Sequence, residues 1–296
     1  RATARLLSLV ERGGVLADEV ASATQAHVGG AHVVGITGAP GSGKSTITNS
    51  LTTLLSEAGQ QPAVLAVDPS SPLTGGAILG DRVRMNGASD AGVFIRSMAT
   101  RGHAGGLALA VPGAVRVLDA AGFDPVVIET VGVGQVEVDV TDAADTTIVV
   151  VAPGWGDAVQ ANKAGLLEVA DLFVVNKADR PGATDARRDL ELMLDLSTVT
   201  GRAGFERPSI TMTTATEGDG IGELATAVAS HLDLLSQGVE LDRRREKRRI
   251  AEVRAHLEHL LVGAADEMLA SEGLQPVRAS ESPMMVARRL AGQLLD

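Results

Sequence analysis

Short runs of apolar, mostly β-branched residues alternate along most of this 296-residue chain with longer segments whose apolar residues recur at helical spacing. Continuous apolar runs separated by helices are typical of strands that are buried on both faces of a parallel sheet. We therefore predict an α/β protein with a mostly parallel central sheet flanked by helices. The expected strands cover residues 33–37, 62–68, 93–98, 125–130, 146–152, 172–177 and 209–215.

The two ends of the chain have a purely helical pattern. Residues 2–27 carry apolar residues at helical intervals broken by a Gly-Gly pair, which predicts two short helices before the first strand. After about residue 238, a long helix and then a last helix over 282–295 are expected. We predict three parts: an N-terminal helical extension (1–30), a central α/β domain (31–238) and a C-terminal helical segment (239–296).

The C-terminal segment begins with a basic run, Arg-Arg-Arg-Glu-Lys-Arg-Arg at residues 243–249. Such a run can bind nucleic acid or an anionic surface. We expect instead the solvated face of a helix, because Ile250, Val253 and Leu257 begin an apolar stripe along one side. That stripe would pack on the core or on another copy of the chain.

Composition and charge exclude several classes of partner. The chain has 26 Lys and Arg against 37 Asp and Glu, a net charge of −11, and its aromatic residues are one Trp and four Phe. An acidic protein with so few aromatic residues has no stacking platform and is a poor binder of nucleic acid. No apolar run approaches the roughly 20 residues that span a bilayer, so we expect no membrane partner.

The chain contains no cysteine, which excludes disulfides, thiol nucleophiles and cysteine-bound metals. We expect a cytoplasmic location, or an organelle matrix if a targeting segment precedes Arg1.

A phosphate-loop sequence follows the first expected strand. Residues 38–45 fit the pattern G-x-x-x-x-G-K-[ST] at every fixed position. In this motif glycines turn the backbone so that N–H groups and a helix N-terminus face a polyphosphate. Lys44 would reach the β and γ phosphates, and Ser45 would bind Mg²⁺. The predicted phosphate-binding residues are Gly38, Ala39, Pro40, Gly41, Ser42, Gly43, Lys44, Ser45 and Thr46.

A guanine-binding sequence follows a later strand. Residues 176–179 read Asn-Lys-Ala-Asp, the N-K-x-D signature of guanine-nucleotide-binding proteins. The carboxylate of Asp179 can accept hydrogen bonds from guanine N1–H and the exocyclic amine, which adenine does not offer in that arrangement. A helix N-cap is the alternative role for Asp179. At the end of the next strand, a backbone N–H is expected to meet guanine O6. The predicted base-binding residues are Asn176, Lys177, Asp179, Thr213, Thr214 and Ala215.

Three carboxylates are candidate Mg²⁺ ligands together with Ser45. Asp68 ends the second expected strand, Asp81 follows a Gly-rich loop, and Glu129 ends the fourth strand. Carboxylates are hard ligands that suit Mg²⁺. A turn-forming role for Asp68 and a helix N-cap role for Asp81 are the alternatives.

The segment after Glu129 is expected to sense the γ phosphate. The N–H of Gly132 would bond this phosphate, so hydrolysis would release the loop that follows. Val133 stands where many GTPases carry the Gln that orients the attacking water. A valine cannot do this, so we predict slow basal hydrolysis, with Gln135 as a candidate substitute.

Read together, these motifs resemble the methylmalonyl-CoA mutase-associated GTPases of the MeaB/ArgK type. The resemblance covers about residues 30–235 and includes VDPSSPLTGGAILGDRVRM, ETVGVGQ and APGWGDAVQANKAG. This group of P-loop GTPases carries Glu, here Glu129, where most carry Asp. The resemblance implies a GTPase that gates adenosylcobalamin loading of a cobalamin-dependent methylmalonyl-CoA mutase and protects that enzyme. It also implies GTP or GDP and Mg²⁺ as cofactors, and a homodimer built through the C-terminal helices.

The resemblance further implies a third switch over residues 153–163. Asp157, Gln160 and Lys163 become candidates for coupling nucleotide state to the mutase, with a polar surface helix as the alternative. Trp155 departs from the smaller or unbranched residue that is usual in that loop. A contact with a partner and a place in the core are its two alternative roles. The predicted catalytic residues are Lys44, Glu129, Gly132 and Lys163.

Three rival functions are considered. A nickel-insertion metallochaperone GTPase shares the Glu feature, but the absence of cysteine and only six scattered histidines give no visible soft-metal site. An ATP-dependent kinase linked to arginine/ornithine transport conflicts with N-K-A-D. A structural adaptor with a vestigial pocket conflicts with the complete set of nucleotide motifs.

Overall fold

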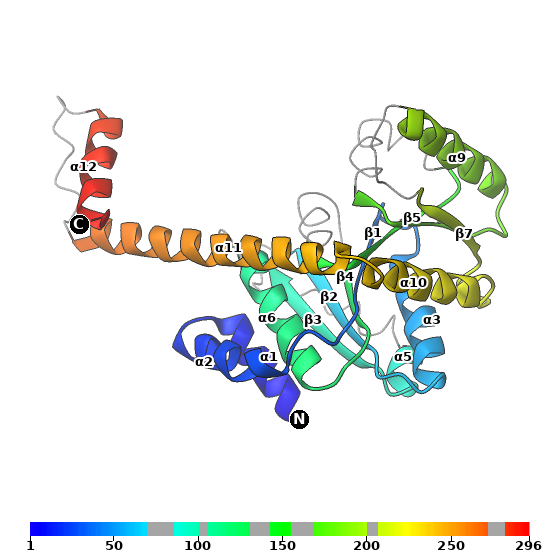
Figure 1. The fold of residues 1–296 in the computed structure, drawn as a ribbon, viewed down its shortest axis with the longest axis horizontal. Coiled ribbons are helices and arrows are strands. Elements are labelled where there is room, and N and C mark those ends of the chain that lie inside the picture. The colour runs from blue at the N-terminus through cyan, green and yellow to red at the C-terminus, as the bar shows by residue number, and fades with distance from the viewer. Residues whose placement is uncertain are drawn as a thin grey trace. The chain divides into compact units, whose positions relative to one another are not determined.

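The computed structural model describes residues 1–69, 86–100, 106–130, 143–154, 169–199, 207–271 and 282–295. The chain divides into two compact units, Arg1–Arg248 and Arg249–Asp296. The first unit holds the sheet (Figure 1). Its strands are β1 (Val33–Gly38), β2 (Ala63–Pro69), β3 (Phe94–Thr100), β4 (Val126–Thr130), β5 (Thr146–Val151), β6 (Leu172–Asn176) and β7 (Ser209–Thr213).

The seven strands form one sheet in the order β3-β2-β4-β1-β5-β6-β7, and every neighbouring pair is parallel. The predicted α/β fold with a parallel sheet is therefore confirmed. Each expected strand is present, and every strand end lies within two residues of its predicted position. Because all strands run the same way, their carboxyl ends meet at one edge of the sheet, with β1 near the middle.

Helices precede, connect and follow the strands. In the first unit they are α1 (Ala2–Arg12), α2 (Val15–Thr24), the short 3-10 helix η1 (Gln25–His27), α3 (Lys44–Glu57), α5 (Asn86–Asp90), α6 (Gly106–Ala120), α9 (Ala183–Val199) and α10 (Ile221–Ser236). Helix α11 (Glu240–Ser271) begins in the first unit and continues into the second, which also contains α12 (Pro283–Leu295). The helical ends predicted from periodicity are confirmed.

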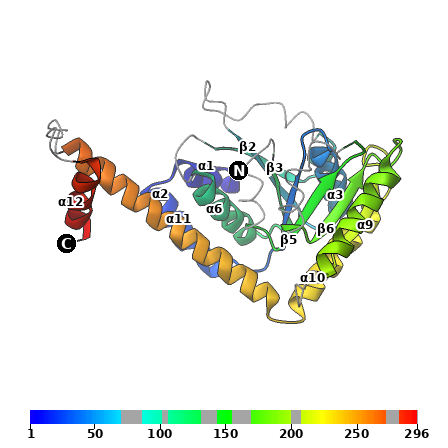
Figure 2. The same ribbon diagram turned by 90° about the horizontal axis from the view of Figure 1, so that it is seen from above.

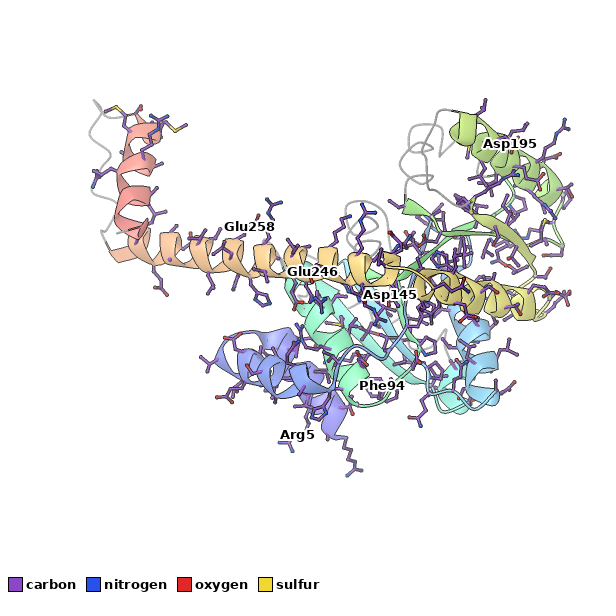
Figure 3. All side chains as sticks on the ribbon, viewed as in Figure 1. Arg5, Phe94, Asp145, Asp195, Glu246 and Glu258 are labelled. Atoms are coloured by element: carbon purple, nitrogen blue, oxygen red, sulfur yellow. The ribbon has the colours of Figure 1, made fainter. Side chains whose placement is uncertain are left out.

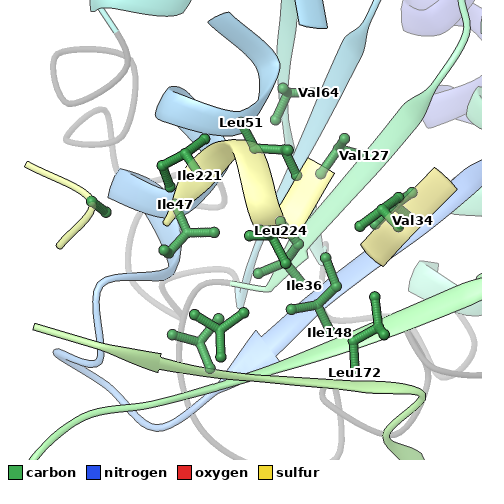
Figure 4. Packing of buried hydrophobic residues seen from close by; sticks show 14 of the residues in the cluster. Val34, Ile36, Ile47, Leu51, Val64, Val127, Ile148, Leu172, Ile221 and Leu224 are labelled. Atoms are coloured by element: carbon green, nitrogen blue, oxygen red, sulfur yellow. The ribbon is translucent and has the colours of Figure 1, made fainter. Parts of the chain in front are cut away.

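One face of the sheet is covered by α3, α5 and α10. Ile47 and Leu51 of α3 and Leu224 of α10 pack with Val34 and Ile36 of β1 in one buried cluster (Figure 4). Full burial of each such aliphatic side chain stabilises the fold by about 1.5–3 kcal/mol. This packing fixes the start of α3 over the end of β1.

The opposite face is covered by α6 and α9, on opposite flanks of the sheet. Successive side chains of a strand point to opposite faces, so Val33 of β1 packs with Val111 of α6. Helices α1 and α2 pack on α6, with Leu7 of α1 and Val20 of α2 in the same buried cluster. Helix α9 runs alongside β5 and β6 (Figure 2), where Leu190 packs on Phe173. Both sheet faces are thus buried, as continuous apolar strands require.

Three arginines of the basic run bind the amino edge of the sheet, so the expectation of a solvated helix face is wrong for them. Arg244 donates to both carboxylate oxygens of Asp171 at 2.8 and 2.9 Å. Arg245 and Arg248 contact Asp145, which lies beside the first turns of α11 (Figure 3). The Asp145 side chain is fully buried, and a buried carboxylate needs such cationic partners.

The second unit carries the predicted apolar stripe of α11. Ile250, Val253 and Leu257 are exposed in the structure. None of the helices among the described residues is long and apolar enough to cross a membrane. The predicted division at residues 30 and 238 stays a prediction.

Candidate nucleotide-binding site

Two glycines give the loop between β1 and α3 its path at the carboxyl edge of the sheet. Gly38 has φ of 138°, and a Cβ there would lie 2.1 Å from the carbonyl oxygen of Val150. Gly43 has φ of 97°, and its Cβ would lie 2.1 Å from Nδ2 of Asn176. Only glycine combines this backbone conformation with such close approach. The loop can therefore curl tightly against β5 and the end of β6.

Lys44 opens α3 and its ammonium group lies on the loop itself. Its Nζ donates to the carbonyl oxygens of Gly38 at 2.6 Å and Ala39 at 3.2 Å, and the residue is 6% exposed. The amino-terminal N–H groups of α3 add the positive end of the helix dipole at the same place. A cation, the N–H groups of a helix N-terminus and a curled backbone together form a site suited to an anion such as a polyphosphate.

Ser45 and Glu129 meet beside this loop. The Ser45 hydroxyl donates to Oε1 of Glu129 at 2.5 Å, and Glu129 is 0% exposed at the end of β4. The register pairs Glu129 with Ile36 of β1, just ahead of the loop. A hydroxyl and a carboxylate in contact form a hard oxygen donor set, which fits Mg²⁺.

Asn176 joins the phosphate loop to the loop after β7. Its Nδ2 donates to the carbonyl oxygen of Ser42 at 2.9 Å. Its Oδ1 accepts from Thr213 Oγ1 at 3.1 Å and from the Ala215 N–H at 3.3 Å. Residues from three segments far apart in sequence are thus held together by one buried amide side chain.

Lys177 adopts a backbone conformation that is unusual for its residue type. Its φ is 61°, a left-handed conformation that costs a non-glycine residue about 1–2 kcal/mol. Such strain tends to occur at binding sites, where the surrounding contacts maintain it. Here Nζ of Lys177 donates to the carbonyl oxygen of Gly41 at 2.7 Å. The side chain thus lies against the phosphate loop, while Asp179 at the end of the motif is exposed.

The loop after β7 differs in detail from the expectation. The strand ends at Thr213, and the Thr214 N–H bonds the carbonyl of Asp219 inside a turn. Of the two backbone N–H groups that follow β7, the one of Ala215 has the longer hydrogen bond: it lies 3.3 Å from Oδ1 of Asn176, whereas the N–H of Thr214 lies 3.0 Å from its acceptor. The sequence analysis did not identify Ser50 as part of this site. The hydroxyl of Ser50, in α3, donates to the carbonyl oxygen of Ala215 at 2.9 Å. This contact joins residues 165 positions apart, and no local pattern marks it.

The family described as methylmalonyl-CoA mutase-associated GTPase MeaB has a model that matches residues 3–268. This chain belongs to that family. The match extends beyond the motifs into both helical ends, from α1 to most of α11. Membership of this P-loop GTPase family implies guanine nucleotide binding, usually with Mg²⁺.

Individual relatives agree with the MeaB assignment. A protein of Pyrococcus abyssi is 47% identical over 267 residues, which are 90% of this chain and 82% of that protein. The mouse protein "Methylmalonic aciduria type A homolog, mitochondrial" is 39% identical over 64% of this chain and 46% of its own length. A crystal structure described as an LAO/AO transport system kinase matches with a TM-score of 0.72 and 27% identity, over 99% of this chain and 93% of that one.

Several predicted MeaB-type site residues lie outside the described part of the chain. The strand β2 includes Asp68, but its side chain is not among those described. The other predicted residues outside the described ranges are Asp81, Gly132, Val133, Gln135, Trp155, Asp157, Gln160 and Lys163. Their roles stay predictions. The described residues bring together the phosphate loop, Glu129 and the N-K-A-D motif.

Proposed function

We propose that this MeaB-family protein binds GTP with Mg²⁺ at the carboxyl edge of its sheet and hydrolyses it slowly. The observation that carries the proposal is the bonding of Asn176, which links the phosphate loop at Ser42 to the base loop at Ala215. A nucleotide would lie along this line, with its phosphates over the start of α3 and its base beside Asp179.

The residues of the phosphate loop would bind and neutralise the phosphates. Lys44 now bonds two loop carbonyls, and a phosphate oxygen offers its ammonium group a stronger, charge-assisted acceptor. Ser45 and Glu129 would hold Mg²⁺, with Asp68 and Asp81 as further candidate ligands; the ion supplies charge neutralisation at the β and γ phosphates. Phosphoryl transfer of this kind depends mainly on positioning and electrostatics.

The switch part of the proposal rests on sequence. Gly132 would bond the γ phosphate and Lys163 would act within the third switch, as the family resemblance implies. Val133 offers no group to orient water, which is the reason to expect slow turnover.

We further propose that the protein acts as a nucleotide-dependent chaperone of a cobalamin-dependent methylmalonyl-CoA mutase, gating adenosylcobalamin loading. The family description and the name of the mouse relative support a mutase partner. A homodimer through the C-terminal helices would cover the exposed stripe that begins at Ile250 and Val253. We expect a cytoplasmic location or an organelle matrix, the latter in line with the mitochondrial relative.

Replacement of Lys44 by alanine tests the nucleotide part. Calorimetry should detect GTP binding and little ATP binding by the unaltered protein, and Lys44→Ala should abolish hydrolysis. Equal affinity for ATP would favour the kinase alternative. Retained turnover by the variant would remove the phosphate-loop assignment.

A pull-down against candidate cobalamin-dependent mutases tests the chaperone part. The protein is loaded with GDP in one arm and with a non-hydrolysable GTP analogue in the other. Capture that depends on the nucleotide supports the proposal, and equal or absent capture in both arms contradicts it.

A further inference from the structure

Ser50 makes a hydrogen bond that differs from the usual one for a hydroxyl residue inside a helix. Serine and threonine in helices often bond the carbonyl four residues earlier, as Thr52 does with Thr48 at 2.7 Å. The hydroxyl of Ser50 instead has its acceptor outside α3, and donates to the carbonyl oxygen of Ala215 at 2.9 Å. The helix that starts at the phosphate loop is thereby bonded directly to the base loop.

This bond fixes the position of Ala215 from one side. Ala215 is 5% exposed, and its two backbone polar groups have different partners. The carbonyl oxygen is held by Ser50, whereas the N–H reaches Asn176 Oδ1 only at 3.3 Å. That acceptor already receives the Thr213 hydroxyl at 3.1 Å. The Ala215 N–H is therefore a donor that a better acceptor could take over at small cost.

We propose that Ser50 is a positioning residue for recognition of the purine base. Its bond to Ala215 holds the Ala215 N–H where an oxygen at position 6 of a bound purine accepts it. Ser50 thereby contributes to selection of 6-oxo purines, while Asp179 reads the N1–H and 2-amino side. This inference rests on the proposed GTP binding and adds a determinant that acts through the backbone of another residue.

Ser56 provides a matched control on the same helix. Its hydroxyl also has its acceptor outside α3, and donates to the carbonyl oxygen of Ala91 at 2.8 Å. Ala91 follows α5, and none of the predicted phosphate-binding or base-binding residues lies in that segment. Ser50→Ala and Ser56→Ala each remove one hydrogen bond from a serine hydroxyl to an alanine carbonyl. If the two variants differ in nucleotide affinity, the difference therefore arises from where the lost bond lies.

The experiment measures affinity for GDP and for 6-thio-GDP by calorimetry. The second ligand keeps the N1–H and 2-amino groups but offers sulfur, a poor acceptor, at position 6. Ser50→Ala should weaken GDP binding about five-fold, the effect of one neutral hydrogen bond, and change 6-thio-GDP binding less than two-fold. Ser56→Ala should change neither, and Ser50→Thr, which keeps a hydroxyl, should retain the preference for GDP.

Each other outcome overturns the inference. If Ser50→Ala weakens both ligands equally, the bond supports the site in general and does not position an O6 donor. If neither affinity changes, Ser50 has no role in binding. Failure of the unaltered protein to bind GDP would refute the proposed function itself, whereas normal GDP binding with an unchanged Ser50→Ala variant refutes only the role of Ser50.

Discussion

The folded chain should lose stability between about pH 6.5 and pH 4 because of one buried histidine. His32 is 5% exposed at the amino end of β1. Its Nε2 lies 2.7 Å from Thr146 Oγ1, and the same hydroxyl lies 2.8 Å from Nδ1 of His231. Burial lowers the pKa of His32 from 6.5 to about 4. Of the nearby charges, Asp145 and Asp124 oppose this shift, and His231 and Arg245 add to it.

The sign and size follow from proton linkage. The unfolded chain takes up a proton at His32 near pH 6.5, whereas the folded chain does so only near pH 4. Between these values the unfolded state binds more protons, so the free energy of unfolding falls as the pH falls. A shift of this size corresponds to about 3 kcal/mol at 1.36 kcal/mol per pH unit. That is a large part of the 5–15 kcal/mol typical of a folded protein.

The carboxylate of Asp171 titrates in a separate, lower window. Burial would raise the pKa of Asp171, but hydrogen bonds from His231 and Arg244 outweigh burial and lower the pKa below 3.8. A depressed carboxylate pKa stabilises the fold above the unfolded value, and this contribution is lost only as the pH falls below about 4. Asp171 therefore adds little to the slope between pH 6.5 and pH 4.5, and a His32 variant isolates the part of that slope that His32 contributes.

Urea unfolding followed by circular dichroism at several pH values between 7 and 4.5 measures this slope. His32→Gln removes the titrating group and should flatten the curve, although it also lowers stability at pH 7 if the bond to Thr146 is lost. His27→Gln, at an exposed histidine on η1, should keep the slope of the unaltered protein. Parallel curves for His32→Gln and the unaltered protein would show that the reasoning about burial is wrong.

Three further substitutions test the site and the arginine contacts. Asp179→Asn should weaken GDP binding by about 100-fold or more and favour xanthosine diphosphate, whose position-2 oxygen suits an amide donor; unchanged calorimetric affinities would contradict the base assignment. Gly43→Ala should destabilise more than Gly41→Ala in thermal unfolding, because both have positive φ but only the first places a Cβ 2.1 Å from another side chain. Asp171→Asn should cost about 3–5 kcal/mol by removing the shorter of the two ion pairs of the partly buried Arg244, whereas Asp189→Asn at an exposed site on α9 should be nearly neutral; similar urea midpoints would refute this.

The sequence predicts the strands and the phosphate loop because both are encoded locally. A continuous apolar run such as 146–152 is typical of a strand that is buried on both faces. The phosphate-loop motif is complete within residues 38–45, so it can be recognised without knowledge of the fold. The same locality explains why the predicted end of the last strand was two residues too far. The bond from Thr214 to Asp219 closes a turn that the apolar pattern does not reveal.

Long-range polar contacts could not be predicted in this way. The basic run has the periodicity of a solvated helix face, and only the fold brings Arg244 within 2.8 Å of Asp171. Burial acts against the charged form of both groups, but the contact between them outweighs it: the pKa of Asp171 is lowered and the pKa of Arg244 is raised from their ordinary values. Ser50 was missed for the same reason, since its partner follows by 165 positions.

The central strands are held by polar side chains at both ends, which bears on how the candidate site keeps its shape. At the amino edge, Asp145 accepts the N–H of Val33 at 3.0 Å and Asp171 accepts the N–H of Thr147 at 2.8 Å. At the carboxyl edge, Asn176 ties the end of β6 to the phosphate loop and the base loop. Strands β1, β5 and β6 are thus fixed where they begin, and β1 and β6 are also fixed where they lead into the nucleotide motifs. A binding site built from loops on such strands is preorganised, so less ordering opposes ligand binding.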